Sequence, residues 1–322
     1  INGTGFGLTM GIHSRIEERC DYLAKMSRAG NVYVNRNMIG AIVGSQPFGG
    51  RGLSGTGPKA GGPLYLTRLV KDNLDVSCAP LDDAKRHRLL SETTSSAVAY
   101  AMPAAISAQQ QWALQSINQR TSVLRQFMAS LAANTVVNKQ EPDLDQILTL
   151  AQQKLARVER ELQKPIALPG PTGESNVLVL DPRGVLALVR DESAAFSHWL
   201  LAIITALAAG NAVVTAVEDA DMAEAEACIK ALQQAGMPQH LVSVVRLDCL
   251  TTLLAHQDLA GAMIDVSSAV KPLCAELLAA REGAILPLIT APAGPQLLHR
   301  GGSKLPARIY LRVDQPLVQS IP

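Results

Sequence analysis

The sequence has few of the features that mark a secreted, membrane-spanning or nucleic-acid-binding protein. Its 322 residues include only five cysteines, which lie far apart with neither a metal-binding nor a paired spacing. Such a scattered, odd number predicts reduced thiols and a cytoplasmic protein. The longest apolar run, residues 199–209, is too short for a bilayer, which needs about 20 residues. The formal net charge is +1, so no strongly charged partner is indicated.

The second half of the chain alternates between apolar strands and helices. Strands that are apolar along their whole length are typical of a parallel sheet covered on both faces. We therefore predict an α/β fold class with a Rossmann-like parallel sheet domain, preceded by helices over 97–134 and 143–163. The predicted strands are Val177–Leu180, Val185–Val189, Ala212–Val217, Leu241–Val245, Met263–Val266 and Ala284–Ile289, and the predicted helices are Ser193–Ala209, Asp221–Ala235 and Val270–Ala280.

The first 70 residues form a different block. We expect a helix that begins with a capping box at Ser14 and Glu17 and ends at Gly30, because apolar residues recur there at helical spacing. Alternation predicts a strand over Asn31–Asn35, and a second strand is expected over Leu64–Leu69. Between them, residues 40–63 hold too much glycine and proline for regular structure, which predicts a shaped loop.

These patterns divide the chain into three parts. Residues 1–70 are expected to be the C-terminal end of a catalytic domain, 71–95 a charged linker with one helical turn, and 96–322 a second domain. The chain opens on apolar Ile1 without a Met, so we infer that it starts inside a domain.

A glycine motif in the loop does not predict a phosphate site. Gly50–Gly55 matches G-x-G-x-x-G, but that motif binds a dinucleotide only when a strand precedes it and a helix opens at its end. Here the flanking residues are again glycine and proline, so tight loop geometry is the better interpretation. The second block lacks a glycine-rich turn after its early strands, which favours a Rossmann-like domain without a cofactor.

No group of residues in the chain predicts a catalytic or metal centre. Cys20, Cys228 and Cys274 fall on apolar helix positions, where core packing is the usual role. No second ligand accompanies any histidine at zinc spacing. The acidic pairs Asp82–Asp83 and Asp191–Glu192 lie at predicted helix starts and are interpreted as caps.

Three segments of the first block resemble a known family. Residues 5–15 (GFGLTMGIHSR), 30–35 (GNVYVN) and 47–50 (PFGG) are similar to the late catalytic segment of aldehyde dehydrogenases. The longer stretch 35–66 resembles the L-glutamate-γ-semialdehyde dehydrogenase module of the proline utilization A family. The resemblance covers the first 70 residues.

The resemblance implies a bifunctional parent enzyme. In this family an FAD-dependent proline dehydrogenase and an NAD-dependent L-glutamate-γ-semialdehyde dehydrogenase share one chain and convert proline to glutamate. It also implies that Gly40 and Ala41 lie in the loop that binds the substrate's α-carboxylate, and that Phe48 packs beside the aldehyde chain. Consecutive backbone N–H groups in such a loop can hold a carboxylate. A plain turn, with Phe48 as a core residue, is the alternative.

The second block resembles the additional aldehyde-dehydrogenase-like C-terminal domain of longer family members. Trp112, Arg120 and Leu124 and the segments 182–185, 206–214 and 236–238 carry this resemblance. Three departures imply a non-catalytic domain without NAD: Arg190–Ala194 replaces Pro-Trp-Asn-Phe-Pro, Ala216 replaces a lysine, and Asp265–Ser267 replaces Thr-Gly-Ser. The family's Gly-Gln-x-Cys nucleophile and Leu-Glu-Leu-Gly-Gly base are absent, which implies that both lie elsewhere in the parent.

Three hypotheses follow. In the first, the chain is the C-terminal part of a proline-catabolic enzyme, where it completes the aldehyde site and a non-catalytic domain covers it. The alternatives are a stand-alone scaffold or oligomerisation protein with a decayed dehydrogenase fold, and an active NAD-binding enzyme. A homo-oligomer is expected, with Leu64–Leu69 available to pair with a neighbouring strand, and nucleic acid is a partner only if the parent carries a DNA-binding module.

Overall fold

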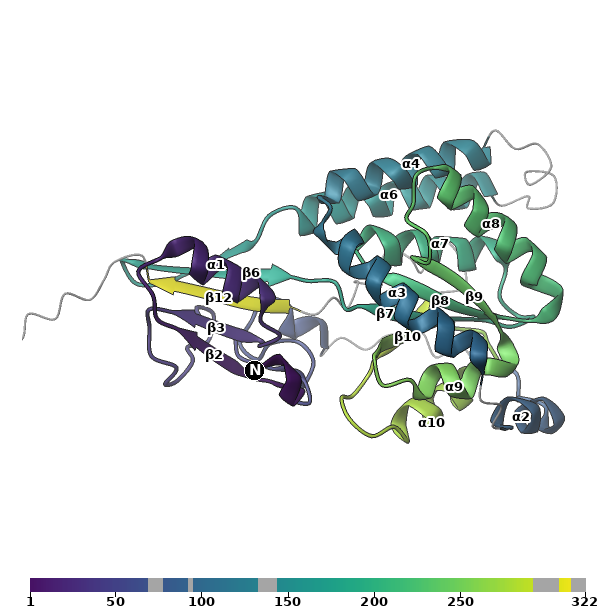
Figure 1. Ribbon diagram of the computed structural model, residues 1–322, viewed down its shortest axis with the longest axis horizontal. Helices are drawn as coiled ribbons and strands as arrows, with labels where there is room; N and C mark the ends of the chain where they lie inside the picture. The colour runs from purple at the N-terminus through teal and green to yellow at the C-terminus, as the bar shows by residue number, and fades with distance from the viewer. Residues whose placement is uncertain (69–77, 92–94, 133–143, 292–306, 314–322) are drawn as a thin grey trace, which may run out of the picture.

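The computed structural model describes residues 1–68, 78–91, 95–132, 144–291 and 307–313. Within these ranges, five strands form a parallel sheet in the larger part of the molecule (Figure 1). Every neighbouring pair in this sheet is parallel, which confirms the predicted Rossmann-like fold. In spatial order the strands are β11 (Leu288–Ala291), β10 (Leu259–Asp265), β7 (Val185–Arg190), β8 (Ala212–Val217) and β9 (Val242–Arg246).

Helices pack around the parallel sheet. Helix α3 lies directly on β7, β8 and β9, and α7 lies on β7, β8 and β10. Helices α4 and α6 pack against α7 as a further layer. The helices of this part are α3 (Ser96–Leu114), α4 (Ile117–Ala132), α6 (Leu144–Leu162), α7 (Phe196–Ala208), α8 (Met222–Gln234), α9 (Leu250–Ala255) and α10 (Lys271–Ala279).

Two buried tryptophans show how helices and sheet are joined. The indole N–H of Trp112 on α3 donates to the carbonyl of Leu207, 2.8 Å away, at the end of α7. The indole N–H of Trp199 on α7 donates to Thr215 Oγ1 on β8, also at 2.8 Å. Each ring therefore buries a large apolar area while its one polar group stays satisfied.

Several expected boundaries differ from the structure: β10 begins at Leu259 instead of Met263, and β6 (Glu174–Leu180) begins at Glu174 instead of Val177. Two further differences have a clear cause. The last strand was predicted over Ala284–Ile289 but begins only at Leu288, because Gly283 has a left-handed φ of 97° and Pro287 has no N–H to donate to a ladder. Helix α7 begins at Phe196 instead of Ser193, and its N-cap Ala195 makes no side-chain cap. The carboxylate of Asp191 instead accepts hydrogen bonds from the N–H and hydroxyl of Ser193. The Asp191–Glu192 pair is therefore not a helix cap.

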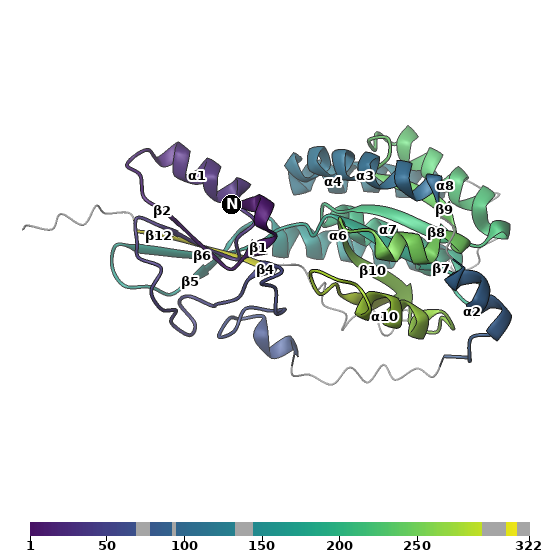
Figure 2. The ribbon, with the colours of Figure 1, turned by 60° about the horizontal axis from the view of Figure 1, so that its bottom comes forward.

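A second sheet joins residues that are far apart in the sequence (Figure 2). The described strands run in the order β2 (Thr9–Ile12), β3 (Asn31–Val34), β12 (Ala307–Val313), β6 (Glu174–Leu180) and β5 (Ile166–Leu168). Strand β12 is parallel to β3 and antiparallel to β6. Strands from residues 1–70 and from residues 96–322 thus share one sheet, although the domain boundaries themselves stay a prediction. Of these strands, β2, β5 and β12 were not predicted.

Helix α1 (Glu17–Met26) covers this mixed sheet, but neither of its predicted ends is correct. Its N-cap is Ile16, and the Ser14 hydroxyl accepts from the N–H of Ile16 at 3.1 Å instead of capping the helix. Its C-cap is Ser27, whereas Gly30 lies just before β3. A Cβ on Gly30 would lie 2.1 Å from the carbonyl oxygen of Gly49. Gly30 is therefore required for close backbone approach.

The region after the loop also differs from the prediction. Tyr65–Arg68 forms a 3-10 helix (η2) where a strand was expected, and Leu69 lies outside the described residues. The N–H of Tyr65 bonds to the carbonyl of Gly62, which turns the chain at Pro63. The remaining short elements are η1 (Asn2–Thr4), η3 (Asp219–Asp221), η4 (Leu247–Cys249) and the antiparallel pair β1 (Phe6–Gly7) and β4 (Arg51–Gly52).

A helix of two turns, α2 (Asp83–Leu90), lies within the predicted linker. Asp82 caps it, because its Oδ2 accepts from the N–H of Lys85 at 3.0 Å. This confirms the Asp82–Asp83 pair as a helix start. Leu89 is fully buried in the core of the parallel-sheet part, so α2 packs as part of that body.

Candidate functional site

The predicted substrate loop, Ile39–Pro63, is called the glycine arc here. Gly40 has a φ of 76°, a left-handed conformation that disfavours other residues. A Cβ at Gly40 would meet nothing within 4 Å, and Gly40 and Ala41 are both exposed. The backbone at Gly40 and Ala41 is therefore accessible to a ligand. That Gly40 and Ala41 bind a carboxylate stays a prediction.

Phe48 lies in a part of the arc that is fixed by backbone pairing. Its N–H donates to the carbonyl of Ala60 at 3.0 Å, and the N–H of Ala60 donates back at 2.9 Å. The Phe48 side chain is 37% exposed, so it is not a core residue as the alternative interpretation required. Its predicted contact with an aldehyde chain stays a prediction.

A buried polar centre beneath the arc holds this segment. Asn31 on β3 is fully buried, and its Nδ2 donates to the carbonyl of Pro47 at 3.0 Å. Its Oδ1 accepts from the N–H of Gly49 at 3.2 Å and from Lys59 Nζ at 3.0 Å. Lys59 Nζ also donates to the carbonyl of Gly49. One side chain of the sheet therefore fixes both sides of Phe48.

Sequence reasoning missed Asn31 and Lys59. Asn31 was assigned only to a strand, and Lys59 only to a loop. The available signal was a lone lysine in the glycine- and proline-rich run GPKAGGP, where a solvated side chain has no evident role. Lys59 is in fact 4% exposed.

Two carboxylates at the ends of β6, which lies two strands away from β3 in the mixed sheet, contact the arc. Glu174 Oε1 accepts from Gln46 Nε2 at 2.9 Å and from Arg36 Nη1 at 3.4 Å. Asp181 Oδ2 accepts from Arg51 Nη1 at 3.0 Å. The arc is thus attached both to β3 and to a strand from the later part of the chain.

The carboxyl edge of the parallel sheet is where a Rossmann fold binds a dinucleotide, and the three predicted departures lie there. The buried Arg190 guanidinium donates to Glu224 Oε2 at 2.7 Å and lies 5.6 Å from the ring centres of Phe196 and Trp199. Ala216 is fully buried on β8. Each of these two positions is therefore used for packing.

Asp265, at the end of β10, is the third departure. Its carboxylate accepts from the N–H and hydroxyl of Ser267 and lies 3.1 Å from His198 Nδ1. Burial alone would raise the pKa of Asp265, but the hydrogen bonds from His198 and Ser267 outweigh it and lower that pKa. A buried carboxylate that stays ionised occupies this turn.

Further carboxylates follow the other strands, and α2 lies across them. Lys85 binds Glu192, which follows β7, and lies 2.7 Å from Glu218, which follows β8. Arg88 binds Glu218 at 3.3 Å and Asp248, after β9, at 3.1 Å. Burial lowers the pKa of Lys85, but its bonds to the two glutamates raise it overall. The edge is acidic and covered by a cationic helix, so its residues do not fit the pyrophosphate of NAD.

Two of the buried cysteines are not activated as nucleophiles. All five are free thiols. Burial raises the pKa of Cys228 and of Cys274 to about 12, so both stay protonated at neutral pH. Cys20 is buried and its thiol lies 3.8 Å from the carbonyl of Ser14. Among the described residues, no three His, Cys, Asp or Glu side chains gather to hold a metal ion, and no helix is long and apolar enough to cross a membrane.

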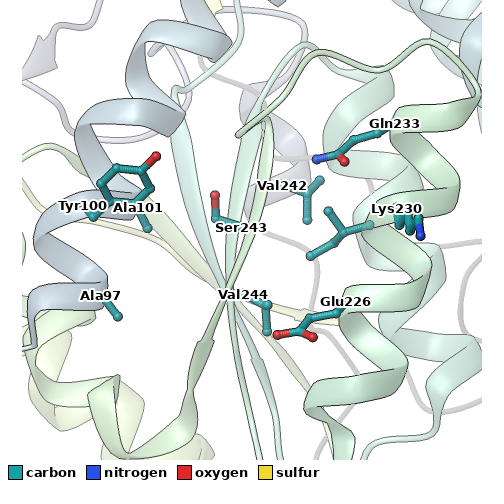
Figure 3. A pocket seen from close by; sticks show the side chains of 10 residues that line it. Ala97, Tyr100, Ala101, Glu226, Lys230, Gln233, Val242, Ser243 and Val244 are labelled. Atoms are coloured by element: carbon teal, nitrogen blue, oxygen red, sulfur yellow. The ribbon is translucent and has the colours of Figure 1, made fainter.

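An open groove of about 540 Å³ lies along β9, an edge strand of the parallel sheet. Figure 3 shows β9 between α3 and α8, with Tyr100 on one side and Lys230 and Gln233 on the other. None of Gly40, Ala41 and Phe48 lines this groove. It is therefore separate from the predicted aldehyde site.

Comparison with known proteins places this geometry in a family. The model of the aldehyde dehydrogenase family matches residues 1–73 and 77–284. The bifunctional protein PutA of Escherichia coli is 35% identical over 299 residues, which is 89% of this chain and 18% of that protein. A 1-pyrroline-5-carboxylate dehydrogenase of Geobacillus is 49% identical over 65 residues, covering 20% of this chain and 13% of the relative.

A solved structure gives the same result. A variant of proline utilization A from Bradyrhizobium japonicum superposes with a TM-score of 0.55 at 26% identity, covering 65% of this chain and 23% of that one. These matches confirm the predicted resemblance to proline utilization A, and this chain spans less than a fifth of the length of the Escherichia coli relative. The chain belongs to the aldehyde dehydrogenase family.

Proposed function

We propose that this chain is the part of a bifunctional proline-catabolic enzyme that contributes the aldehyde-binding arc of its L-glutamate-γ-semialdehyde dehydrogenase site, together with a non-catalytic domain. The observation that carries the proposal is the arc itself. Its backbone at Gly40 is exposed and left-handed and its Phe48 is partly exposed, while Asn31 and Lys59 bind the arc from beneath. An anchored loop with exposed backbone at Gly40 and Ala41 suits recognition of a carboxylate.

The cofactors of the proposed enzyme would bind outside this chain. NAD would serve the dehydrogenase site and FAD the proline dehydrogenase site of the parent. The acidic carboxyl edge under α2 supports a second domain without NAD. The cysteine nucleophile that forms the bond to the aldehyde would likewise come from the parent.

The partners we propose are the rest of the parent polypeptide, the substrate L-glutamate-γ-semialdehyde and further copies of the enzyme in the cytoplasm. Ile39 and Val43 of the arc are 84% and 83% exposed, which is apolar surface that protein contacts would bury. The free thiols fit a reducing compartment.

A substitution at Gly40 tests the proposal. In the full parent polypeptide, Gly40→Val should raise the KM for L-glutamate-γ-semialdehyde about tenfold, because a side chain at this φ distorts the backbone that binds the carboxylate. The measurement is NADH formation at varied aldehyde concentration.

Gly236→Val is the matched control. Gly236 also has a left-handed φ, of 99°, and open space at its Cβ, but it follows α8, away from the arc. An unchanged KM for Gly40→Val, or an equal rise for both variants, would reject the role of the arc.

A further inference from the structure

The arrangement of β6 suggests how the later part of the chain acts on the glycine arc. Glu174 begins this strand and Asp181 directly follows it. Glu174 binds Gln46, and Asp181 binds Arg51. Phe48 lies between these two attachment points in the sequence. The segment that carries the predicted aldehyde contact is therefore fixed at both ends by one strand.

The contact at Glu174 is the more buried of the two. The Glu174 side chain is 9% exposed, and Gln46 is 1% exposed. Asn176 Nδ2 donates to the same Oε1 at 2.9 Å and to the carbonyl of Pro169 at 3.0 Å. The carboxylate is therefore also held by a residue of its own strand, independently of the arc. Arg36 supplies the opposite charge. Hydrogen bonds between charged and polar groups are strongest in such partly dehydrated surroundings.

The attachment also reaches the predicted carboxylate-binding residues. The N–H of Gln46 donates to the carbonyl of Ile42 at 2.7 Å, and Ile42 directly follows Ala41. A shift of Gln46 would therefore move the turn at Gly40 and Ala41 as well as Phe48. At the other end, the Arg51 and Asp181 side chains are 20% and 25% exposed.

We infer that Glu174 and Asp181 are positioning residues for the aldehyde-binding segment of the glycine arc, so that strand β6 sets the geometry of a substrate site to which it contributes no contacting side chain. The inference rests on the proposed function. Neither carboxylate touches the predicted substrate-binding residues, and each acts through one arc side chain, Gln46 or Arg51.

Amide hydrogen exchange tests the attachment in the full parent polypeptide. The double variant E174A/D181A should accelerate exchange at the amides of Gln46 and Phe48 about tenfold. Opening of the arc then no longer requires the contacts with Glu174 and Asp181 to break, so it costs less free energy. The conservative pair E174Q/D181N should give a smaller change. Unchanged protection of β8 amides shows that the variants fold. The matched control is Glu161→Ala, which removes an ion pair with Arg157 inside α6.

Kinetics separate positioning from a merely structural attachment. In E174A/D181A we expect the KM for L-glutamate-γ-semialdehyde to rise about tenfold while kcat changes less than about twofold, because the bound substrate and the transition state lose binding energy equally. Equal exchange in the variant and the original overturns the inference, and so does faster exchange with an unchanged KM. If the original polypeptide does not oxidise this aldehyde, the proposed function fails; faster exchange would then still support the attachment, and only the substrate assignment would be rejected.

Discussion

The glycine arc and the carboxyl edge of the parallel sheet are two loop regions of one fold, and they are stabilised in opposite ways. The arc is held from beneath by the neutral amide of Asn31 and one buried lysine, and its outer backbone at Gly40 is open. The edge is filled with carboxylates, and the lysine and arginine side chains of α2 lie on them. The first arrangement leaves exposed backbone that an anionic ligand can reach. In the second, the carboxylates of the chain itself already occupy the cations of α2. A retained fold does not by itself indicate a retained site.

The largest effect is expected at the centre of the arc. Asn31→Ala leaves the Pro47 carbonyl, the Gly49 N–H and the Lys59 ammonium buried with one partner fewer each, so it should lower the free energy of unfolding by about 3 kcal/mol. Urea unfolding measures the change. Asn118→Ala, an exposed asparagine on α4, should change stability by less than about 0.5 kcal/mol. A small effect at Asn31 would mean that the arc is held mainly by its own backbone.

A smaller effect is expected at the edge. Lys85→Ala removes the cation shared by Glu192 and Glu218 and should cost about 1–2 kcal/mol, because its side chain is only 13% exposed. The difference should shrink in high salt, since exposed Glu192 is easily screened. The exposed Lys230→Ala is the control, with a change below about 0.5 kcal/mol.

The same variant sharpens the contrast in ligand binding. Calorimetric titration of this chain alone, carrying Lys85→Ala, with NAD should show no saturable binding, because Asp265, Glu218 and Asp248 keep the edge acidic after the cation is removed. Saturable binding would show that α2, and not the carboxylates, excludes the dinucleotide.

The smallest effect concerns an ion pair that belongs to neither region. Hydrogen bonds from Arg125 and Thr121 lower the pKa of Glu159 from 4.5 to about 2. Because this folded-state pKa is depressed, the stabilisation is complete above pH 4.5 and is lost as the pH falls toward 2. Glu159→Gln should therefore cost about 1 kcal/mol at neutral pH, discounted for partial exposure, and nothing near pH 2. Urea unfolding across this pH range checks it; a constant difference would contradict the assigned cause.

The sequence was most informative where periodicity alone decides structure. The runs at Val185–Val189 and Ala212–Val217 are apolar at every position but Thr215, which is typical of a strand buried on both faces. Both strands are found there with at most one residue added. It was least informative where a side chain meets a distant segment. The Ser14 hydroxyl accepts from the N–H of Ile16, whereas the capping box required the N–H of Glu17. Asp191 accepts from the hydroxyls of Ser193 and Ser268 instead of from the N–H groups of a helix end.

The candidate site shows the same limit. Gly40, Ala41 and Phe48 were chosen from family resemblance, and the structure adds the residues that hold them. Asn31 has no distinctive signature within an alternating strand, because its role arises only when Pro47, Gly49 and Lys59 fold over it. Glu174 and Asp181 are separated from their arc partners by 128 and 130 residues, so no local pattern could link them.

The mixed sheet has a consequence for how the chain folds. Asn31 and Val32 of β3 pair with Ile309 and Tyr310 of β12, so β3 is synthesised long before the strand that completes its pairing. Closing so long a loop is entropically costly, and folds dominated by such non-local pairing form slowly. The parallel-sheet body can assemble from its own consecutive units first. Until β12 is synthesised, one edge of β3 stays unpaired. Extended segments of other chains can bind an edge of this kind.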